Sequence, residues 1–484
     1  MGAADRGRRR LPWRRAGGLV NGARERAAVG TTARLMRSAA AADSARFPLA
    51  AFRERLRAHG HRSFAVERVP FADLDQWHAE PGTGNLRHRT GRFFTVEGLR
   101  RTAWGDPGPG AVRPVMVQPE IGVLGIVVKE FDGVLHLLLQ AKAEPGNVPA
   151  VQLSPTVQAT RSNSTRSHGG SAVRFLEYFT SPARGRVLAD VLQSEHGEYF
   201  LHKRNRHMLV ETGEEVPEHP DFHWLTLGQL YRLLHEDRLV NMDTRSVLAC
   251  APLAPASAPA TDRDGGGVWH SLGGASRPRH TMEEVVRWLT RARAGQSHVS
   301  RPVPLAEVEE SGWRRGPEEI SRDGGPFRVV AVRVRTAGRE VGSWCQPLVN
   351  PRGAGVSAFG ATRFDGVLHV LAQAKEEPGL ITGPEVAPTV QCLPGESAPF
   401  ADRLLSAPAE RIRFDTVLAE EGGRFLAADN RYLLVEDDTL PAIPPPGYHW
   451  LTLRQLARLT AWGHHVSVQA RTLLVCALAA AADA

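Results

Sequence analysis

The sequence has no long apolar run and few cysteines. No stretch reaches the roughly 18 apolar residues that a membrane-spanning helix needs, so none is expected. The four cysteines include no CxxC pair, which argues against a zinc site. Cys250 and Cys476 end similar apolar runs (SVLAC and TLLVC). We therefore expect buried, unreactive thiols and a reducing, cytoplasmic location.

Common catalytic motifs are also missing. No strand-like segment leads into GxGxxG, and there is no Walker A motif and no GxSxG nucleophile motif. HExxH and a clustered carboxylate triad are absent too. The sequence thus points to no metal and no redox cofactor.

Positive charge is concentrated at the N-terminus. Residues 1–46 contain eleven arginines, no lysine and three acidic residues, an excess of eight that equals the formal charge of the whole chain. The rest of the chain is formally neutral, so any basic surface for nucleic acid would have to be this tail. Its Arg, Ala and Gly content favours a disordered, solvated tail over a functional arm.

The sequence contains one stretch twice. Residues 131–158 read FDGVLHLLLQAKAEPGNVPAVQLSPTVQ, and residues 364–391 read FDGVLHVLAQAKEEPGLITGPEVAPTVQ, aligned without a gap at a separation of 233 positions. Hydrophobic patterning alone cannot produce two copies this long and this polar. The chain is therefore predicted to be a duplicated unit with a duplicated site.

Other segments extend the duplication. Helical patterns over 48–59 and 281–294 each precede a VP motif, and the second begins with a capping box at Thr281. Strands are expected near 91–101, 113–118 and 325–335. Two HWLTL segments lead into helices with Thr226 and Thr452 as N-caps. The predicted fold class is α+β with antiparallel sheets, and the predicted parts are a tail (1–46), a repeat (47–250), an Ala/Pro/Gly linker (251–280) and a second repeat (281–484).

A row of polar side chains marks the repeated strand. If 133–144 is a strand, His136, Gln140, Lys142 and Glu144 share one face, and leucines and alanines share the other. The second copy keeps the same four residue types while neighbouring positions have diverged. A half-exposed sheet face is the plain interpretation, but a shared row favours a site in which a lysine beside a carboxylate performs acid–base work.

The segments after this strand suggest a ligand. Residues 160–166 follow a shared Pro-Thr-Val-Gln motif in the first copy and combine hydroxyls, an amide and two arginines, which suits a phosphate-bearing ligand or a polar surface loop. A tryptophan at the entry of each unit, Trp77 or Trp313, could stack on a nucleobase or serve as a core or lid residue.

At VLHLLLQAKAEPGN and VQLSPTVQATRSN, with the second copy QAKEEPG and PTVQC, the sequence resembles the NDP-hexose 2,3-dehydratase family of bacterial deoxysugar biosynthesis. The resemblance spans about residues 47–478 and both HWLTL segments. It implies tandem Nudix-like domains, usually in a homodimer, although the Glu-rich metal-binding helix of Nudix hydrolases is missing here. It also implies dTDP-4-keto-6-deoxy-D-glucose as substrate, with no cofactor, and a downstream NADPH-dependent 3-ketoreductase as functional partner.

The chemistry of such a reaction fits the residues. The ketone at carbon 4 acidifies the proton on carbon 3, and a general acid can assist loss of the hydroxyl on carbon 2. Lys142 and Glu144 are the expected acid–base pair, with His136 as a further candidate. The expected substrate-binding residues are Trp77, Gln140, Asn147, Gln152, Ser154, Thr156, Gln158, Thr160, Arg161, Ser162, Asn163, Ser164, Trp313, Lys375, Glu377, Thr389, Gln391, Cys392 and Leu393.

The first copy has the richer loop, so catalysis is placed there, and the second copy is expected to be a second nucleotide-sugar site. Two other functional classes stay open at this stage. One is a Nudix-type nucleotide-sugar pyrophosphohydrolase, and the other is a non-catalytic nucleotide-sugar-binding protein. Neither a membrane nor a nucleic acid is an expected partner.

Overall fold

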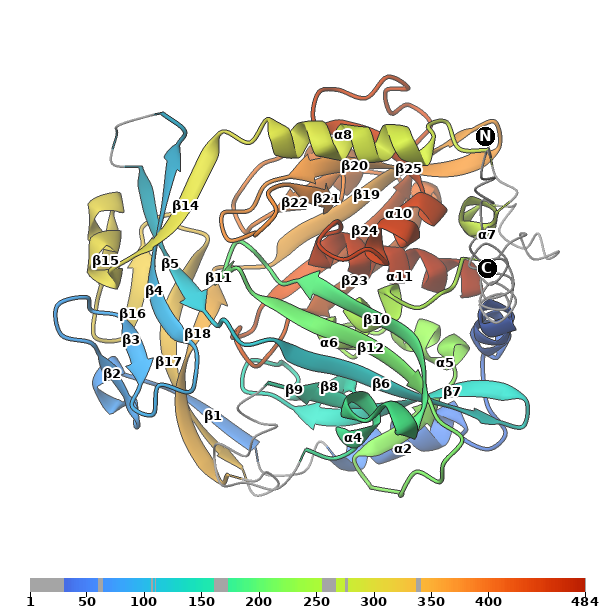
Figure 1. Ribbon diagram of the computed structural model, residues 1–484, viewed down its shortest axis with the longest axis horizontal. Coiled ribbons are helices and arrows are strands. Elements are labelled where there is room, and N and C mark those ends of the chain that lie inside the picture. The colour runs from blue at the N-terminus through green and yellow to red at the C-terminus, as the bar shows by residue number, and fades with distance from the viewer. Residues whose placement is uncertain are drawn as a thin grey trace, which may run out of the picture.

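The two copies of the repeated stretch form two seven-stranded sheets of the same topology in the computed structural model (Figure 1). The model describes residues 30–59, 64–105, 108, 110–160, 173–254, 267–274, 277–336 and 341–483. In each sheet one pair of strands is parallel and the others are antiparallel. The expectation of a mixed α+β fold with repeated units is confirmed.

The first sheet has the order β10-β12-β6-β7-β13, with β8 on β7 and β9 on β6. The second has the order β21-β20-β19-β24-β23, with β22 on β19 and β25 on β20. The bounds are β6 Gly122–Phe131, β7 Val134–Ala143, β8 Val151–Pro155, β9 Val157–Ala159, β10 Arg186–Ser194, β12 Arg204–Glu211, β13 Phe222–Leu225, β19 Gly355–Phe364, β20 Val367–Lys375, β21 Glu385–Ala387, β22 Val390–Cys392, β23 Ile412–Ala419, β24 Asp429–Glu436 and β25 Tyr448–Thr452.

Helices from both repeats lie between the two sheets and share one core (Figure 1). They are α5 Leu227–Leu233, α6 Met242–Ala249, α10 Leu453–Thr460 and α11 Val468–Asp483. Helix α11 is mostly Ala, Leu and Val on every side, as expected of a helix that is surrounded by protein. The largest hydrophobic cluster includes Leu209 and Val247 from the first repeat with Leu434 and Leu473 from the second. The repeats therefore do not have separate cores.

The helix starts predicted from capping residues are confirmed. Thr226, Thr452 and Thr281 each accept a hydrogen bond from the N3 amide of their helix and complete a capping box. Helix α2 is Leu49–His59 and α8 is Met282–Ala294. The short helices α4 Glu177–Thr180 and α9 Ala401–Leu405 each contribute to a small cluster on the outer face of one sheet.

Two further sheets each combine strands of both repeats. Strand β1 (Phe64–Val69) leaves the first repeat and pairs with β17 (Phe327–Thr336) of the second. In return, β14 (His298–Val303) of the second repeat pairs with β4 (Thr95–Ala103) of the first. The remaining strands are β2 Trp77–Ala79, β3 Leu86–His88, β5 Ala111–Val117, β11 Phe200–Leu201, β15 Trp313–Arg315, β16 Glu319–Arg322 and β18 Ser343–Pro351.

The segment 30–46 differs from the disordered tail expected over residues 1–46. Residues 30–40 form a helix in which Leu35 and Ser38 are fully buried. The Ser38 hydroxyl donates to the carbonyl of Leu135 on β7 and accepts from the amide of Leu227 at the start of α5. This part of the expected tail is ordered because Leu35 and Ser38 are buried against the first repeat, which the Ala and Arg content of the segment does not indicate. Residues 1–29 lie outside the described residues.

The segment 251–280, expected to be a linker, contains the counterpart of this helix. Helix α7 (Val268–Leu272) carries Ser271, whose hydroxyl donates to Leu368 on β20 and accepts from the amide of Leu453 at the start of α10. Each repeat therefore begins with a helix and a buried serine, separated by 233 positions like the repeated stretch. Residues 255–266 lie outside the described residues.

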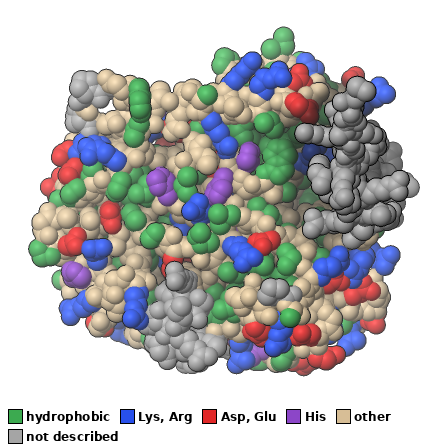
Figure 2. All heavy atoms as spheres, in the orientation of Figure 1, with side chains coloured by type: hydrophobic (Ala, Val, Ile, Leu, Met, Phe, Trp, Pro, Cys, Tyr) green, Lys and Arg blue, Asp and Glu red, His purple; other side chains and the backbone are tan. Residues whose placement is uncertain are grey.

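Charge is mixed over the molecular surface. In Figure 2, basic and acidic side chains are interspersed over the face in view. Many of them form ion pairs, as between Arg206 and Asp190 and between Arg431 and Asp415 at equivalent positions. None of the described helices is long and apolar enough to cross a membrane.

Candidate functional site

Lys142, Glu144 and Gln158 come together at the end of β7. The ammonium group of Lys142 lies 2.8 Å from Glu144 Oε1 and 2.7 Å from Gln158 Oε1. Glu144 is 3% exposed, and the Lys142 side chain is 18% exposed. The group forms because β7 presents Lys142 toward the short strands β8 and β9, and β9 carries Gln158. A lysine held between a buried carboxylate and an amide is suited to proton transfer.

His136 lies at the other end of the row and does not join this group. Six residues along a strand correspond to about 20 Å, so the imidazole cannot reach the end of β7. Its Nε2 is 2.9 Å from Ser44 Oγ, and the ring packs edge-on against Phe47 and Phe131. His369 is held in the same way in the second repeat, by the amide of Arg279. Both histidines anchor the N-terminal segment of their repeat, which gives a structural reason for their identity.

Three of the hydroxyls predicted to bind the substrate, those of Ser154, Thr156 and Thr389, make internal hydrogen bonds. Thr156 Oγ1 donates to the carbonyl of Leu138 and accepts from the amide of Val127, and Thr389 makes the equivalent bonds in the second repeat. Ser154 accepts from the side chain of Asn241. These hydroxyls satisfy main-chain and helix-cap groups within the sheet, so they are placed in the framework of the site.

The two tryptophans also belong to the framework. Trp77 is 6% exposed, and its indole N–H donates to the carbonyl of Cys345 in the other repeat at 2.8 Å. Trp313 is 3% exposed and packs against Phe327. Both belong to one hydrophobic cluster that joins the repeats. In this arrangement neither ring offers an open face on which a nucleobase could stack.

Amide side chains around Lys142 have unsatisfied polar atoms. Gln152 is paired in register with Lys142, so the two side chains emerge on the same face of the sheet. Gln152 is fully buried and Asn147 is 6% exposed, and neither amide group has a hydrogen-bond partner among the described residues. Gln140 lies two residues before Lys142 on the same face of β7 and is half-buried. Buried amides of this kind are expected to bind a ligand or water.

The phosphate-binding loop predicted after Pro-Thr-Val-Gln is only partly described. Thr160 is half-buried at the end of β9. The remaining predicted residues of this loop, Arg161, Ser162, Asn163 and Ser164, lie outside the described residues.

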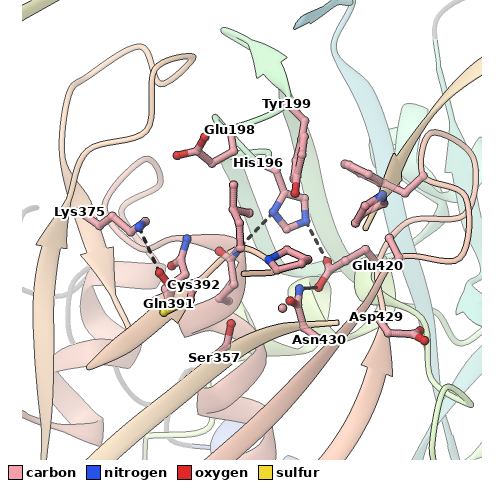
Figure 3. Close-up of a pocket in the computed structure, with 17 residues that line it drawn as sticks. His196, Glu198, Tyr199, Ser357, Lys375, Gln391, Cys392, Glu420, Asp429 and Asn430 are labelled. Atoms are coloured by element: carbon pink, nitrogen blue, oxygen red, sulfur yellow. Dashed lines mark hydrogen bonds and ion pairs between the residues drawn. The ribbon is translucent and has the colours of Figure 1, made fainter. Parts of the chain in front are cut away.

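The second repeat has a pocket at the equivalent place, seen in Figure 3. Its walls include four residues that the sequence predicted, Lys375, Gln391, Cys392 and Leu393. Glu377 lies beside it, 5% exposed, and accepts from the Gln391 side chain at 2.6 Å. The Lys375 ammonium binds the carbonyl of Gln391 at 3.1 Å and forms no ion pair equivalent to that of Lys142 and Glu144. Over the described residues, the two sites therefore differ in their hydrogen bonding.

Each site is completed by a loop from the other repeat. His196, Glu198 and Tyr199 of the first repeat line the pocket of the second (Figure 3). Conversely, the amide of Gly146, in the turn after β7, donates to the carbonyl of Gly422 at 2.8 Å. The amide of Gly379 makes the same bond to Gly197 at 2.8 Å. The loops 195–200 and 420–425 are thus equivalent, and each faces the opposite repeat.

The loops carry different ionisable groups. In the second site, His196 Nε2 is 2.8 Å from Glu420 and Nδ1 is 3.1 Å from Gln469. The charge of Glu420 outweighs burial and raises the pKa of His196, while His196 and neighbouring donors lower the pKa of Glu420 to about 2 despite its burial. In the first site the equivalents of His196 and Gln469 are Glu421 and Asp243. Burial raises the pKa of both carboxyl groups, that of Glu421 to about 7.

Two buried arginines hold these loops in place. Arg471, on α11, donates to the carbonyl of Ser194 at 2.8 Å, immediately before the loop that carries His196. Arg245, on α6, donates to the carbonyl of Ala419 at 2.9 Å, before the loop that carries Glu421. Both arginines are fully buried and reach across to the opposite repeat. Each arginine therefore positions the loop that the opposite repeat contributes to the site of the arginine's own repeat.

Sequence reasoning missed the residues on these loops. The segments LQSEHGEYF (192–200) and LAEEGGRF (418–425) align through Asn205 and Asn430, which each donate to the first glutamate of their loop at 2.7 and 2.5 Å. The shared Glu-x-Gly pattern was the available signal. It was overlooked because the next residue, His196 or Glu421, differs between the copies.

Comparison with known proteins covers both repeats. The chain matches the NDP-hexose 2,3-dehydratase family over residues 50–251 and 282–477. It belongs to this family. The match leaves the first 49 residues and the segment between the repeats outside it. It includes both loops that cross between the repeats.

Three curated relatives share the family and most of the length. A protein of Amycolatopsis orientalis named dTDP-4-dehydro-6-deoxy-alpha-D-glucopyranose 2,3-dehydratase is 49% identical, covering 87% of this chain and 88% of its own. Proteins of the same name from Streptomyces violaceoruber and Saccharopolyspora spinosa are 44% and 45% identical, covering 88% and 86% of this chain and 95% and 88% of their own. This family member is therefore a sugar-nucleotide dehydratase, a carbon–oxygen lyase.

Proposed function

We propose that this dehydratase removes water from dTDP-4-dehydro-6-deoxy-D-glucose. The proton leaves carbon 3 and the hydroxyl leaves carbon 2, which gives dTDP-3,4-diketo-2,6-dideoxy-D-glucose. The Lys142–Glu144–Gln158 group carries this proposal on the structural side, since it joins a buried base and a cation at one end of a duplicated strand. The names of the three relatives support the same substrate.

The proposed chemistry uses this group directly. Glu144 takes the carbon-3 proton, and the charge of Lys142 stabilises the enolate that develops on the carbon-4 oxygen. The amides of Gln152 and Gln158 bind the sugar oxygens. Loss of the carbon-2 hydroxyl leaves an enol on carbons 2 and 3, which tautomerises to the second ketone. Electrons and atoms balance without an oxidant, since the products are water and the diketo sugar.

We further propose a cytoplasmic homodimer built from two Nudix-like domains per chain. The buried free thiols support the location. Because a vicinal diketone beside a deoxy carbon is reactive, an NADPH-dependent 3-ketoreductase is the expected consumer of the product. The second site, with Lys375, Glu377 and Gln391, is proposed to bind a nucleotide sugar.

The test is incubation of the purified chain with dTDP-4-dehydro-6-deoxy-D-glucose, without added metal, followed by mass spectrometry. Loss of one water, or release of dTDP with a sugar breakdown product, is expected. A parallel sample with a 3-ketoreductase and NADPH should trap a stable 2,6-dideoxy sugar nucleotide. Release of dTMP and sugar phosphate would instead identify a pyrophosphohydrolase. Substrate that binds and stays unchanged would identify a binding protein.

A further inference from the structure

The first site contains a carboxyl group, that of Glu421, in addition to the Lys142–Glu144–Gln158 group. The turn after β7 and the loop 420–427 interlock through the amide of Ala427, which donates to the carbonyl of Gly146, and the amide of Gly146, which donates to the carbonyl of Gly422. A Cβ at Gly146 would stand 1.4 Å from the carbonyl oxygen of Phe425, so only glycine permits this approach. The contact places Glu421 of the second repeat at the site of the first.

Glu421 lies next to Glu144. The point at which a Cβ of Gly423 would stand is 2.3 Å from Glu421 Oε1 and 3.8 Å from Glu144 Oε1. The missing side chain at Gly423 leaves room for both carboxyl groups. Among the described residues, Glu144 has an ion pair with Lys142, whereas the Glu421 carboxyl group has no hydrogen-bonded cation. The two carboxyl groups therefore have different electrostatic environments although they are neighbours.

The space around them is built for a polar ligand. Gln152 is fully buried on the same face as Lys142, and both of its amide atoms lack a hydrogen-bond partner among the described residues. The same holds for Asn147, which lies against Gly422. Asp243 is 1% exposed, and its Oδ2 also lacks a partner there. Unsatisfied buried groups from three elements converge on the carboxyl pair, which is the expected state of a polar binding site without its ligand.

We propose that Glu421 is the catalytic acid that protonates the departing carbon-2 hydroxyl, so that the second repeat completes the active site of the first. This rests on the proposed dehydratase function. Glu144 removes the carbon-3 proton, the electron pair forms the enolate, and its collapse breaks the carbon–oxygen bond at carbon 2. The Glu421 proton leaves with that oxygen as water. Glu144 then returns its proton to carbon 2 while the carbon-3 hydroxyl loses its own to the Glu421 carboxylate.

The charges that face Glu421 agree with this assignment. They belong to Lys142, Glu144, Glu195, Lys203, Asp243 and Arg424, which come from both repeats. Burial and the negative charges of Glu144 and Glu195 raise the pKa of Glu421 to about 7, against the opposing effect of Arg424 and Lys142. A carboxyl group in this range holds a proton at neutral pH and can release it, whereas one paired with an ammonium group acts as base.

The second site lacks this function at the equivalent position. His196 stands there with both ring nitrogens hydrogen-bonded, one to Glu420 and one to Gln469. No ring proton is left for a leaving hydroxyl. The difference places acid-assisted elimination in the first site alone.

The experiment compares two leaving groups. Wild type, Glu421→Gln and Glu144→Gln are assayed with the natural substrate and with its 2-chloro analogue, from which chloride leaves without a proton. Glu421→Gln is expected to lower kcat by about 10²- to 10⁴-fold on the natural substrate, with KM little changed, but to release chloride within a few-fold of wild type. Glu144→Gln should lose both reactions. Glu218→Gln, an exposed change of the same chemistry, should behave as wild type.

The melting temperature of each variant checks that it is folded. Glu421→Asp serves as a conservative variant, which should recover part of the activity of wild type and shift the basic limb of the pH profile of kcat. Equal losses on both substrates, or no loss on the natural one, would overturn the role of Glu421. A wild-type enzyme that eliminates neither water nor chloride would refute the dehydratase function itself, which separates the two failures.

Discussion

Lys142 and Glu144 are the residues on which the proposed chemistry most directly depends. Lys142→Ala removes the cation at the enolate oxygen and leaves Glu144 buried without its partner. We expect kcat to fall by about 10²-fold or more, because electrostatic stabilisation of an oxyanion contributes at least this much. Single-turnover mass spectrometry of the water loss measures it, with Lys129→Ala, whose ammonium group binds the carbonyl of Glu214 outside the site, as a control. Full turnover by Lys142→Ala would remove this residue from the mechanism.

Glu385 provides a test of buried charge. It is 1% exposed, and burial raises its pKa to about 7, although Ser194 Oγ donates to it. A carboxyl group with a raised pKa is protonated in the folded state, so the stability of wild type should fall as pH rises from about 4.5 to 7. Glu385→Gln keeps an acceptor for Ser194 and removes the titration.

We expect Glu385→Gln to unfold like wild type at pH 4 and to be more stable by about 3 kcal/mol at pH 8. The first repeat already has a glutamine, Gln152, at the equivalent position. Denaturant unfolding at the two pH values gives the difference. An equal stability difference at both pH values would contradict a titration at Glu385.

At this scale, sequence predicted the residues that both copies retain. The grouping of Lys142 with Glu144 and Gln158 followed from strand alternation and the duplication. His136, the further acid–base candidate, shares this face of the strand but lies six residues back along it, so its catalytic role stays a prediction. Glu421 was missed because it comes from the other repeat, which no pairing within one copy can reveal.

Among the elements, the helices after HWLTL show how local and tertiary contacts add. The Thr452 hydroxyl caps α10 and otherwise makes only a long bond within the same helix start, to Gln455 at 3.4 Å, whereas the Thr226 hydroxyl caps α5 and also donates to the carbonyl of Ala41 in the N-terminal segment. We expect Thr452→Ala to cost about 1 kcal/mol, the usual value of an N-cap. Thr226→Ala should cost about 1 kcal/mol more, because a hydrogen bond to another segment of the chain is also lost.

Urea unfolding of both variants tests this difference. Equal costs for the two caps would mean that the contact of Thr226 with the N-terminal segment contributes nothing to stability.

The elements themselves were largely predictable. N-cap residues and apolar periodicity predicted α5, α8 and α10 because these signals are local. The helix over 30–40 was not predicted, since its stability comes from burial of Leu35 and from the bond of Ser38 to β7 rather than from its own composition. Tertiary packing of this kind leaves little trace in a short Ala- and Arg-rich segment.

For the whole molecule, the exchange of β1 and β14 means that the repeats hold together without the connection between them. Cleavage at a protease site inserted between residues 254 and 267 should leave the halves associated and active, because the shared core and two shared sheets remain. Size-exclusion chromatography and the water-loss assay check this. Either half expressed alone should be inactive and poorly folded. An active single half would contradict a composite site.

The duplication in the sequence predicts two repeats but not this exchange. Strand β1 of the first repeat and β14 of the second occupy equivalent positions in their repeats. The sequence pattern is therefore the same whether each strand pairs within its own repeat or with the other repeat. Only the three-dimensional path of the chain distinguishes the two arrangements. The predicted division into two repeats for the same reason did not reveal their common core.

The reciprocal exchange of strands and loops has a consequence for the history of the molecule. A single repeat with this architecture would need a second copy to cover its strands, and the natural arrangement is a symmetric dimer. In such a dimer, one mutation alters both active sites at once. Joining the two copies in one chain frees each loop to change separately, which is what the Glu421 and His196 positions display. Fusion of two copies in one chain thus allows the two sites to acquire different residues and different roles.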